Sequence, residues 1–146
     1  MAQDFVGTKQ ALLEAAGELF SESGLDGASI RSIAEKVGAN IAAINYHFRS
    51  KENLYTEVLR FVLTHNRCDH AAALLEDETW SQTLEGKAQA IRELVFERFR
   101  SYFSQSHPRW HARLVMRSML DPTPSLATVV EQVMLPEHMR LKKVLQ

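Results

Sequence analysis

Hydrophobic residues recur along this chain at spacings of three and four, which is the period of an amphipathic helix. A first such segment covers about Phe5–Ser23, and its apolar positions are Leu12, Leu13, Ala16, Leu19 and Phe20. Gly24 stands where a left-handed residue would end the helix. The pattern therefore predicts a first helix that buries one apolar stripe.

Two much shorter periodic segments follow, and each carries its own start and stop signals. Ser29 is a good N-cap for a second helix, and Gly38 is placed to end it. Asn40 can cap a third, very short helix over residues 41–47. Two short helices joined by a glycine-containing turn of about three or four residues form a helix-turn-helix. The side chains expected to pack against the first helix are Ile30, Ile33, Ile44 and Phe48.

The third helix would present a face of amides, methyl groups and a phenol to solvent. That face consists of Asn40, Ala42, Ala43, Asn45 and Tyr46. It suits a DNA major groove, because asparagine can hydrogen-bond adenine and alanine can contact the thymine methyl group. We therefore expect base-edge contacts from Asn40, Ala42, Ala43 and Asn45, with capping of the helix as the alternative role of Asn40.

Helical periodicity continues to the end of the chain. The expected elements are a fourth helix capped by Ser50 and running to about 75, a loop 76–83, helices 84–105 and 125–135, and between them a helix starting at Pro108. Pro136 is expected to kink or end the last of these. Residues 137–146 remain periodic without a stop signal, which suggests a chain cut within a helix. The fold class expected is all-α, with a three-helix helix-turn-helix domain at 1–50 and a helical, incomplete bundle at 51–146.

Composition narrows the class of protein. The 146 residues include 17 basic and 18 acidic side chains, 45% hydrophobic residues, 6 glycines and 4 prolines, which disfavours a disordered chain or an all-β sandwich. The single cysteine, Cys68, cannot form an internal disulfide, so a reducing compartment is expected. No apolar run approaches the roughly 18 residues of a membrane span. These observations favour a soluble cytoplasmic protein that has no membrane contact.

A set of residues in fixed order carries a resemblance to a known family. They are Ala15-Ala16, Leu19-Phe20, Gly24, Ser29, Ile33-Ala34, Val37-Gly38, Tyr46-His47-Phe48, Ser50-Lys51-Glu52 and Leu54. With this spacing, Thr8–Leu59 resembles the DNA-binding domain of TetR-type (TetR/AcrR) transcriptional regulators. The chain departs from the family pattern at Ile41, where many relatives carry lysine, and at Asn45, where many carry tyrosine. These two departures affect which operator sequence would be recognised more than whether the domain would bind DNA.

The resemblance implies contacts to the DNA backbone. Tyr46, His47 and Lys51 match family positions that touch phosphates, and the start of the fourth helix would add free amides. Ser29 and Arg31 are candidates for phosphates across the groove, as are Thr8 and Lys9 before the apolar stripe of the first helix. The alternative for Tyr46 and His47 is an aromatic packing cluster, and the alternative for Lys51 is an ordinary surface lysine. Ser29 could serve only as the N-cap of the second helix.

The second half of the chain offers candidates for a small-molecule cavity. They are Trp80, Phe96, Phe99, Phe103, Trp110, Met116 and Met119. Such a cavity would favour an apolar or aromatic effector. The alternative is an ordinary core stripe, because Phe96, Phe99 and Phe103 have plain helical spacing.

Metal and enzyme chemistry find little support in the sequence. Ligand-like spacings occur at His65, Cys68, Asp69, His107 and His111, but no convergent further ligand is evident, so no metal or other cofactor is expected. The sequence shows no nucleophile–base pair, phosphate-binding glycine loop or paired carboxylates, so we do not expect an enzyme.

The functional hypothesis is therefore a ligand-responsive DNA-binding regulator. As the family resemblance implies, it would be a repressor that binds a palindromic operator as a homodimer and is released by a small-molecule effector. The alternative is a helical protein-interaction module whose helix-turn-helix no longer binds DNA. An enzyme joined to a DNA-binding head is a third class.

Overall fold

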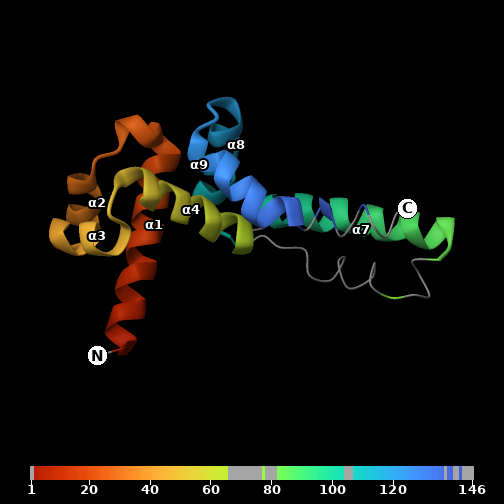
Figure 1. The fold of residues 1–146 in the computed structure, drawn as a ribbon, viewed down its shortest axis with the longest axis horizontal. Coiled ribbons are helices and arrows are strands. Elements are labelled where there is room, and N and C mark those ends of the chain that lie inside the picture. The colour runs from red at the N-terminus through yellow and green to blue at the C-terminus, as the bar shows by residue number, and fades with distance from the viewer. Residues whose placement is uncertain are drawn as a thin grey trace.

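The computed structural model describes residues 2–65, 77, 82–103, 107–136, 138, 139 and 142, and it describes side chains for these residues except 2–8, 98, 102 and 103. Within these ranges every regular element is a helix, which confirms the all-α expectation (Figure 1). No helix of the described part is long and apolar enough to span a membrane.

The first helix, α1, spans Ala2–Gly27 and is longer at both ends than the sequence predicts. Gly24 breaks its helical geometry with φ 75° and ψ −179°, as expected for a residue without a Cβ, but one further turn follows. Arg117 covers this break. Its Nε donates to the Ser21 carbonyl at 3.2 Å and its Nη2 donates to the Glu22 carbonyl at 2.8 Å.

The next three helices begin and end close to their sequence signals. They are α2 (Ile30–Val37), α3 (Ile41–Phe48) and α4 (Lys51–His65). Residues 66–75, which the sequence assigns to the fourth helix, lie outside the described residues, as does most of the expected loop 76–83.

The remaining helices are α7 (Leu84–Phe103), α8 (Arg109–Leu120), α9 (Pro124–Val129) and a π-helical turn, η1 (Val130–Met134). Pro108 is the N-cap of α8 rather than a residue of its first turn. Residues 135 and 136 are helical, so the last helix reaches Pro136, and residue 137 lies outside the described residues. A proline clashes with the carbonyl four residues earlier. Here the Leu135 N–H reaches the Val130 carbonyl, five residues back, so the hydrogen-bond ladder is already shifted before the proline.

One hydrophobic core joins the two halves of the chain. Its buried side chains come from α1, α2, α3, α4, α8 and α9. Phe20 of α1 meets Tyr55 of α4 edge to face, with ring centroids 5.0 Å apart. Figure 1 shows α2 and α3 on one side of α1 and α4, α8 and α9 on the other, and α7 extending away.

The contact between α1 and α8 depends on a glycine. A Cβ added to Gly17 would lie 2.2 Å from Cζ3 of Trp110, so only glycine lets the buried indole approach the α1 backbone this closely. The core is thus continuous across residues 50 and 51, the boundary at which the sequence divides the chain.

Candidate nucleic-acid interface

Side-chain caps fix the two short helices α2 and α3. The Ser29 hydroxyl accepts from the Ser32 N–H at 3.0 Å, and the Ser32 hydroxyl accepts from the Ser29 N–H at 3.3 Å, forming a reciprocal capping box. Gly38 ends α2 in the left-handed conformation with φ 66°. Asn40 Oδ1 then accepts from the Ala42 N–H at 2.9 Å and starts α3. Such caps are needed because an eight-residue helix is marginal by itself.

Burial of the apolar positions orients α3. Ile33, Ile44 and Phe48 are buried as the sequence predicts, whereas Ile30 is only half-buried. With Ile44 and Phe48 facing the core, the opposite side of α3 must face outward.

The outward side of α3 carries almost no charge. Ala42 and Asn45 are exposed, Tyr46 is 78% exposed, and Ala43 is half-buried. Asn40 is exposed as well, but its side-chain oxygen is engaged in the cap. Both roles that the sequence suggests for Asn40 are therefore compatible, since the cap uses the oxygen and not the amide nitrogen.

The groups expected to touch the DNA backbone flank this face. The Tyr46 and His47 rings lie edge to face, 5.5 Å apart, and the Lys51 ammonium donates to the Ala28 carbonyl at 3.3 Å. That bond brings the start of α4 beside the start of α2, so Lys51 and Ser29 lie at neighbouring helix N-termini.

The N-terminus of α4 stabilises negative charge. The Ser50 hydroxyl caps the helix by accepting from the Asn53 N–H at 3.1 Å. The pKa of Glu52 lies below its usual value, chiefly because a backbone N–H and the Ser50 side chain hydrogen-bond its carboxylate. The free amides of a helix start act on a phosphate in the same way.

Two other predicted phosphate ligands lie on the exposed surface. Arg31 forms an ion pair with Glu35, with Nε and Oε1 2.9 Å apart and both side chains exposed, and such a pair is weak enough to be exchanged for a phosphate. Lys9 is exposed on α1. The side chain of Thr8 lies outside the described residues.

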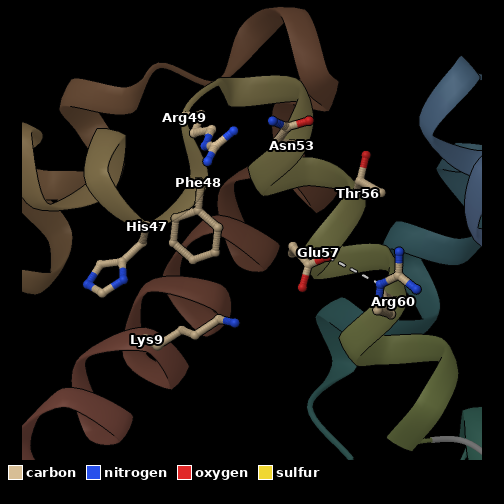
Figure 2. A pocket seen from close by; sticks show the side chains of 8 residues that line it. All are labelled: Lys9, His47, Phe48, Arg49, Asn53, Thr56, Glu57 and Arg60. Atoms are coloured by element: carbon tan, nitrogen blue, oxygen red, sulfur yellow. Dashed lines mark hydrogen bonds and ion pairs between the residues drawn. The ribbon is translucent and has the colours of Figure 1, made fainter.

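A polar pocket of about 410 Å³ lies between α1, the end of α3 and α4. Figure 2 shows its lining, which consists of Lys9, His47, Phe48, Arg49, Asn53, Thr56, Glu57 and Arg60. Of the polar members, only Lys9 and His47 are predicted from the sequence to contact DNA. The short link between Phe48 and Ser50 was a signal that a residue there takes an unusual conformation, and Arg49 indeed has φ 64°.

The predicted cavity residues of the second half differ in burial in the described structure. Phe96 and Phe99 are 61% and 64% exposed on α7, and Met116 and Met119 are exposed on α8. Trp110 is instead buried against α1. Trp80 and the side chain of Phe103 lie outside the described residues. Among the described members of this set, Trp110 is buried, and the other four residues, on α7 and α8, are exposed.

The histidines of the second half form an aromatic cluster. The ring of His111 is buried in α8 and stacks on His107 with centroids 5.8 Å apart, and Phe61 lies against both His65 and His111. Burial, with smaller contributions from His107 and His65, lowers the pKa of His111 to about 4. In the described part of the chain no three metal-ligating side chains are placed to hold an ion, and Cys68 and Asp69 lie outside it.

Comparison with known proteins gives consistent matches along the chain. Residues 12–58 match the family model of bacterial regulatory proteins of the tetR family, and residues 88–146 match the C-terminal domain of the HTH-type transcriptional dual regulator CecR. CecR of Shigella flexneri is 31% identical over 140 residues, covering 94% of this chain and 62% of that protein. The tetracycline repressor protein class A from transposon 1721 of Escherichia coli is 32% identical over 84 residues, covering 58% and 38%.

The fold has relatives among solved structures. A tetR-family structure from Shewanella sp. PV-4 superposes with a TM-score of 0.65 at 22% identity, covering 91% of this chain and 66% of that one. This likeness concerns the fold. The chain spans less than two thirds of the length of either curated relative, 62% and 38%.

Proposed function

The chain belongs to the TetR family of bacterial transcriptional regulators, and from this we propose that it binds double-stranded DNA with α3 in the major groove. The observation that carries the proposal is the outward face of α3, which is largely exposed, nearly uncharged and flanked by side chains that can donate hydrogen bonds to phosphates. A face that merely contacts solvent would be expected to carry more charge. The family and the relatives that the chain matches are transcriptional regulators, so we propose a DNA-binding protein and not an enzyme.

We assign each side chain a role in that complex. Base edges are contacted by Asn40, Ala42, Ala43 and Asn45. Backbone phosphates are contacted by Ser29, Arg31, Tyr46, His47 and Lys51. The two groups separate because phosphate contacts position the protein and base contacts read sequence.

The regulatory part of the proposal rests on the relatives. One relative is named as a repressor and another as a dual regulator. We propose a repressor that acts in the cytoplasm as a homodimer, with its two α3 helices about one DNA turn apart on a palindromic operator. Residues 1–50 would read DNA, and residues 51–146 would hold a small apolar or aromatic effector.

The fold offers a route from effector to DNA. Helix α4 shares the core of α1 and also contacts η1, where Arg60 Nη2 donates to Gln132 Oε1 at 2.6 Å. An effector that binds one position of α4 more tightly than another would change the separation of the two reading heads.

Selection of bound duplexes from a random pool tests DNA binding, symmetry and spacing together. We expect enrichment of a palindrome with half-site centres about one helical turn apart. Failure to bind any duplex, even at low ionic strength, would instead support the helical interaction module.

Two substitutions test the assigned roles. Lys51→Ala should weaken binding to all sequences and lower the salt slope by about one unit, whereas Asn45→Ala should relax preference at one base pair by about 1–3 kcal/mol. Lys87→Ala, on α7, is the matched control and should change neither quantity. Equal, negligible effects of Lys51→Ala and Asn45→Ala would contradict the groove assignment.

A further inference from the structure

The pocket of Figure 2 has an excess of positive charge that DNA reading does not explain. Lys9, Arg49 and Arg60 are cationic at neutral pH, and Glu57 is the one carboxylate in the lining. Lys9 and His47 of the lining are also predicted to contact DNA, whereas Arg49 and Arg60 are not. The pocket draws its side chains from three segments far apart in the sequence, so the charge excess is a property of the fold and not of one helix face.

Arg49 occupies a position that would be easier for glycine. Among the described residues it is the one non-glycine residue with positive φ, at 64°. A side chain in this region costs free energy, and such strain persists where the side chain has a use. The backbone itself does not require arginine, because the helix end needs only the Arg49 N–H, which bonds to the Asn45 carbonyl at 2.9 Å.

The cations differ in how they are held. Arg60 is fixed at the pocket wall, with its Nε 3.2 Å from Glu57 Oε1 and its Nη2 bonded to Gln132. Within the described part of the chain, neither Lys9 nor Arg49 forms an ion pair with a carboxylate. Among the described residues, Lys9 and Arg49 are therefore not paired with a carboxylate, and they lie beside a third cation, Arg60, whose geometry is preorganised.

We propose that this pocket binds the phosphate group of a small phosphate monoester. Three cations against one carboxylate leave an excess of two charges, and a phosphate monoester carries about −1.5 to −2 at pH 7. Arginine presents planar pairs of donors that match phosphate oxygens, and the Asn53 amide lines the same pocket.

The shape of the site favours a small molecule over the backbone of a duplex. Its volume of about 410 Å³ lies within the range of small-ligand pockets, which is about 300–1,000 Å³. A phosphate group fills only part of that space, so an attached organic group also fits. A diester in a duplex carries a single charge and would match only half of the excess. The site does not depend on DNA binding, so this proposal and the proposed function can fail separately.

Calorimetric titration with glycerol 3-phosphate and with inorganic phosphate tests the site directly, at pH 7.5 and constant ionic strength. We expect saturable binding of one phosphate per chain, with acetate and chloride giving none. Absence of saturation at millimolar phosphate, or equal binding of acetate, would overturn the proposal.

Four variants locate the site. Arg49→Gly removes the guanidinium and also the backbone strain, and it should weaken phosphate binding by about tenfold or more, as expected for loss of a charge-assisted hydrogen bond. Lys9→Ala should weaken it similarly. Glu57→Gln removes the repelling carboxylate and should strengthen binding several-fold. Arg92→Ala, an exposed arginine on α7, is the matched control and should bind phosphate as the parent does.

Stability measurements keep the test interpretable. Arg49→Gly should unfold at the same temperature as the parent or higher, because glycine adopts positive φ without a penalty. Unchanged phosphate binding in both Arg49→Gly and Lys9→Ala, or an equal loss in Arg92→Ala, would show that the pocket is not the site.

Discussion

Helices α3 and α7 are both amphipathic, yet they use their apolar residues in opposite ways. In α3 the large side chains Ile44 and Phe48 are buried, and the outward face is made of amides, methyl groups and a phenol. In α7 the large side chains Val95, Phe96 and Phe99 are all more than 60% exposed in the described structure. The short helix buries both of these large side chains, whereas the long helix exposes large apolar side chains.

The difference follows from how each helix is tied to its neighbours. α3 is connected to α2 and α4 by very short links whose conformations are set by Gly38, Asn40 and Arg49, so its buried side has one possible partner. The links at both ends of α7 include residues 78–81 and 104–106, which lie outside the described part of the chain. For α3, the apolar period shows that the helix has a side to bury, and the short links decide what that side contacts.

The largest expected effect comes from matched truncations on the two helices. Ile44→Ala should destabilise the protein by about 2–5 kcal/mol, because it removes a fully buried side chain from a packed core. Phe96→Ala should change the free energy of unfolding by less than about 0.5 kcal/mol, as at other exposed positions. Urea denaturation at equal protein concentration measures both.

The contrast fails if Phe96→Ala costs as much as Ile44→Ala. That result would mean that the apolar face of α7 is covered in solution, and the exposure of Phe96 and Phe99 would no longer distinguish the two helices.

The contrast between α3 and α7 also shows which parts of the fold could be predicted from the sequence. The caps at Ser29 and Asn40 and the left-handed turn at Gly38 were predictable, because each depends on side chains within a few residues. The buried side of α3 followed from them. The spread of Phe96, Met116 and Trp110 to different surroundings did not follow, since helical period carries no information on the partner.

The polar pocket also lay beyond local rules. Lys9 and Arg60 are brought together only by the packing of α1 on α4. The short link between Phe48 and Ser50 indicates an unusual backbone conformation, but arginine is not a residue that sequence rules place at positive φ, so the residue type does not point to Arg49. The π-helical turn before Pro136 likewise needs three-dimensional information, because a proline by itself predicts an interruption.

The next effect concerns His111, a buried histidine on α8 in the second half of the chain. Its Nδ1 has no hydrogen-bond partner within the described residues, and its pKa is lowered to about 4. The charged groups around it are His107, His65 and Glu14, the last of which opposes the shift. Because the folded state binds this proton less readily than the unfolded state, stability should fall as pH drops from about 6.5 towards 4.

The resulting loss of unfolding free energy is on the order of 3 kcal/mol at most, and no such loss is expected above pH 7. Unfolding free energies measured at pH 7.5 and 4.5 should therefore converge in His111→Phe, which keeps an aromatic ring beside Phe61 and Trp110. His107→Gln, on the half-buried neighbour, should retain most of the pH dependence. Parallel pH profiles for the parent and His111→Phe would rule out His111 as the cause.

The smallest expected effect is the difference in stability between the loss of one helix cap in each half of the chain. Ser29→Ala removes a reciprocal capping box, with bonds of 3.0 and 3.3 Å, and should cost about 1 kcal/mol. Thr123→Ala removes a single bond of 3.3 Å to the Leu126 N–H at the start of α9 and should cost less. Thermal unfolding of the two variants gives the difference. A larger loss of stability in Thr123→Ala would mean that α2 and α3 are stabilised by their buried side chains and not by their caps. In that case the caps of α2 and α3 would set where these helices begin without adding to their stability.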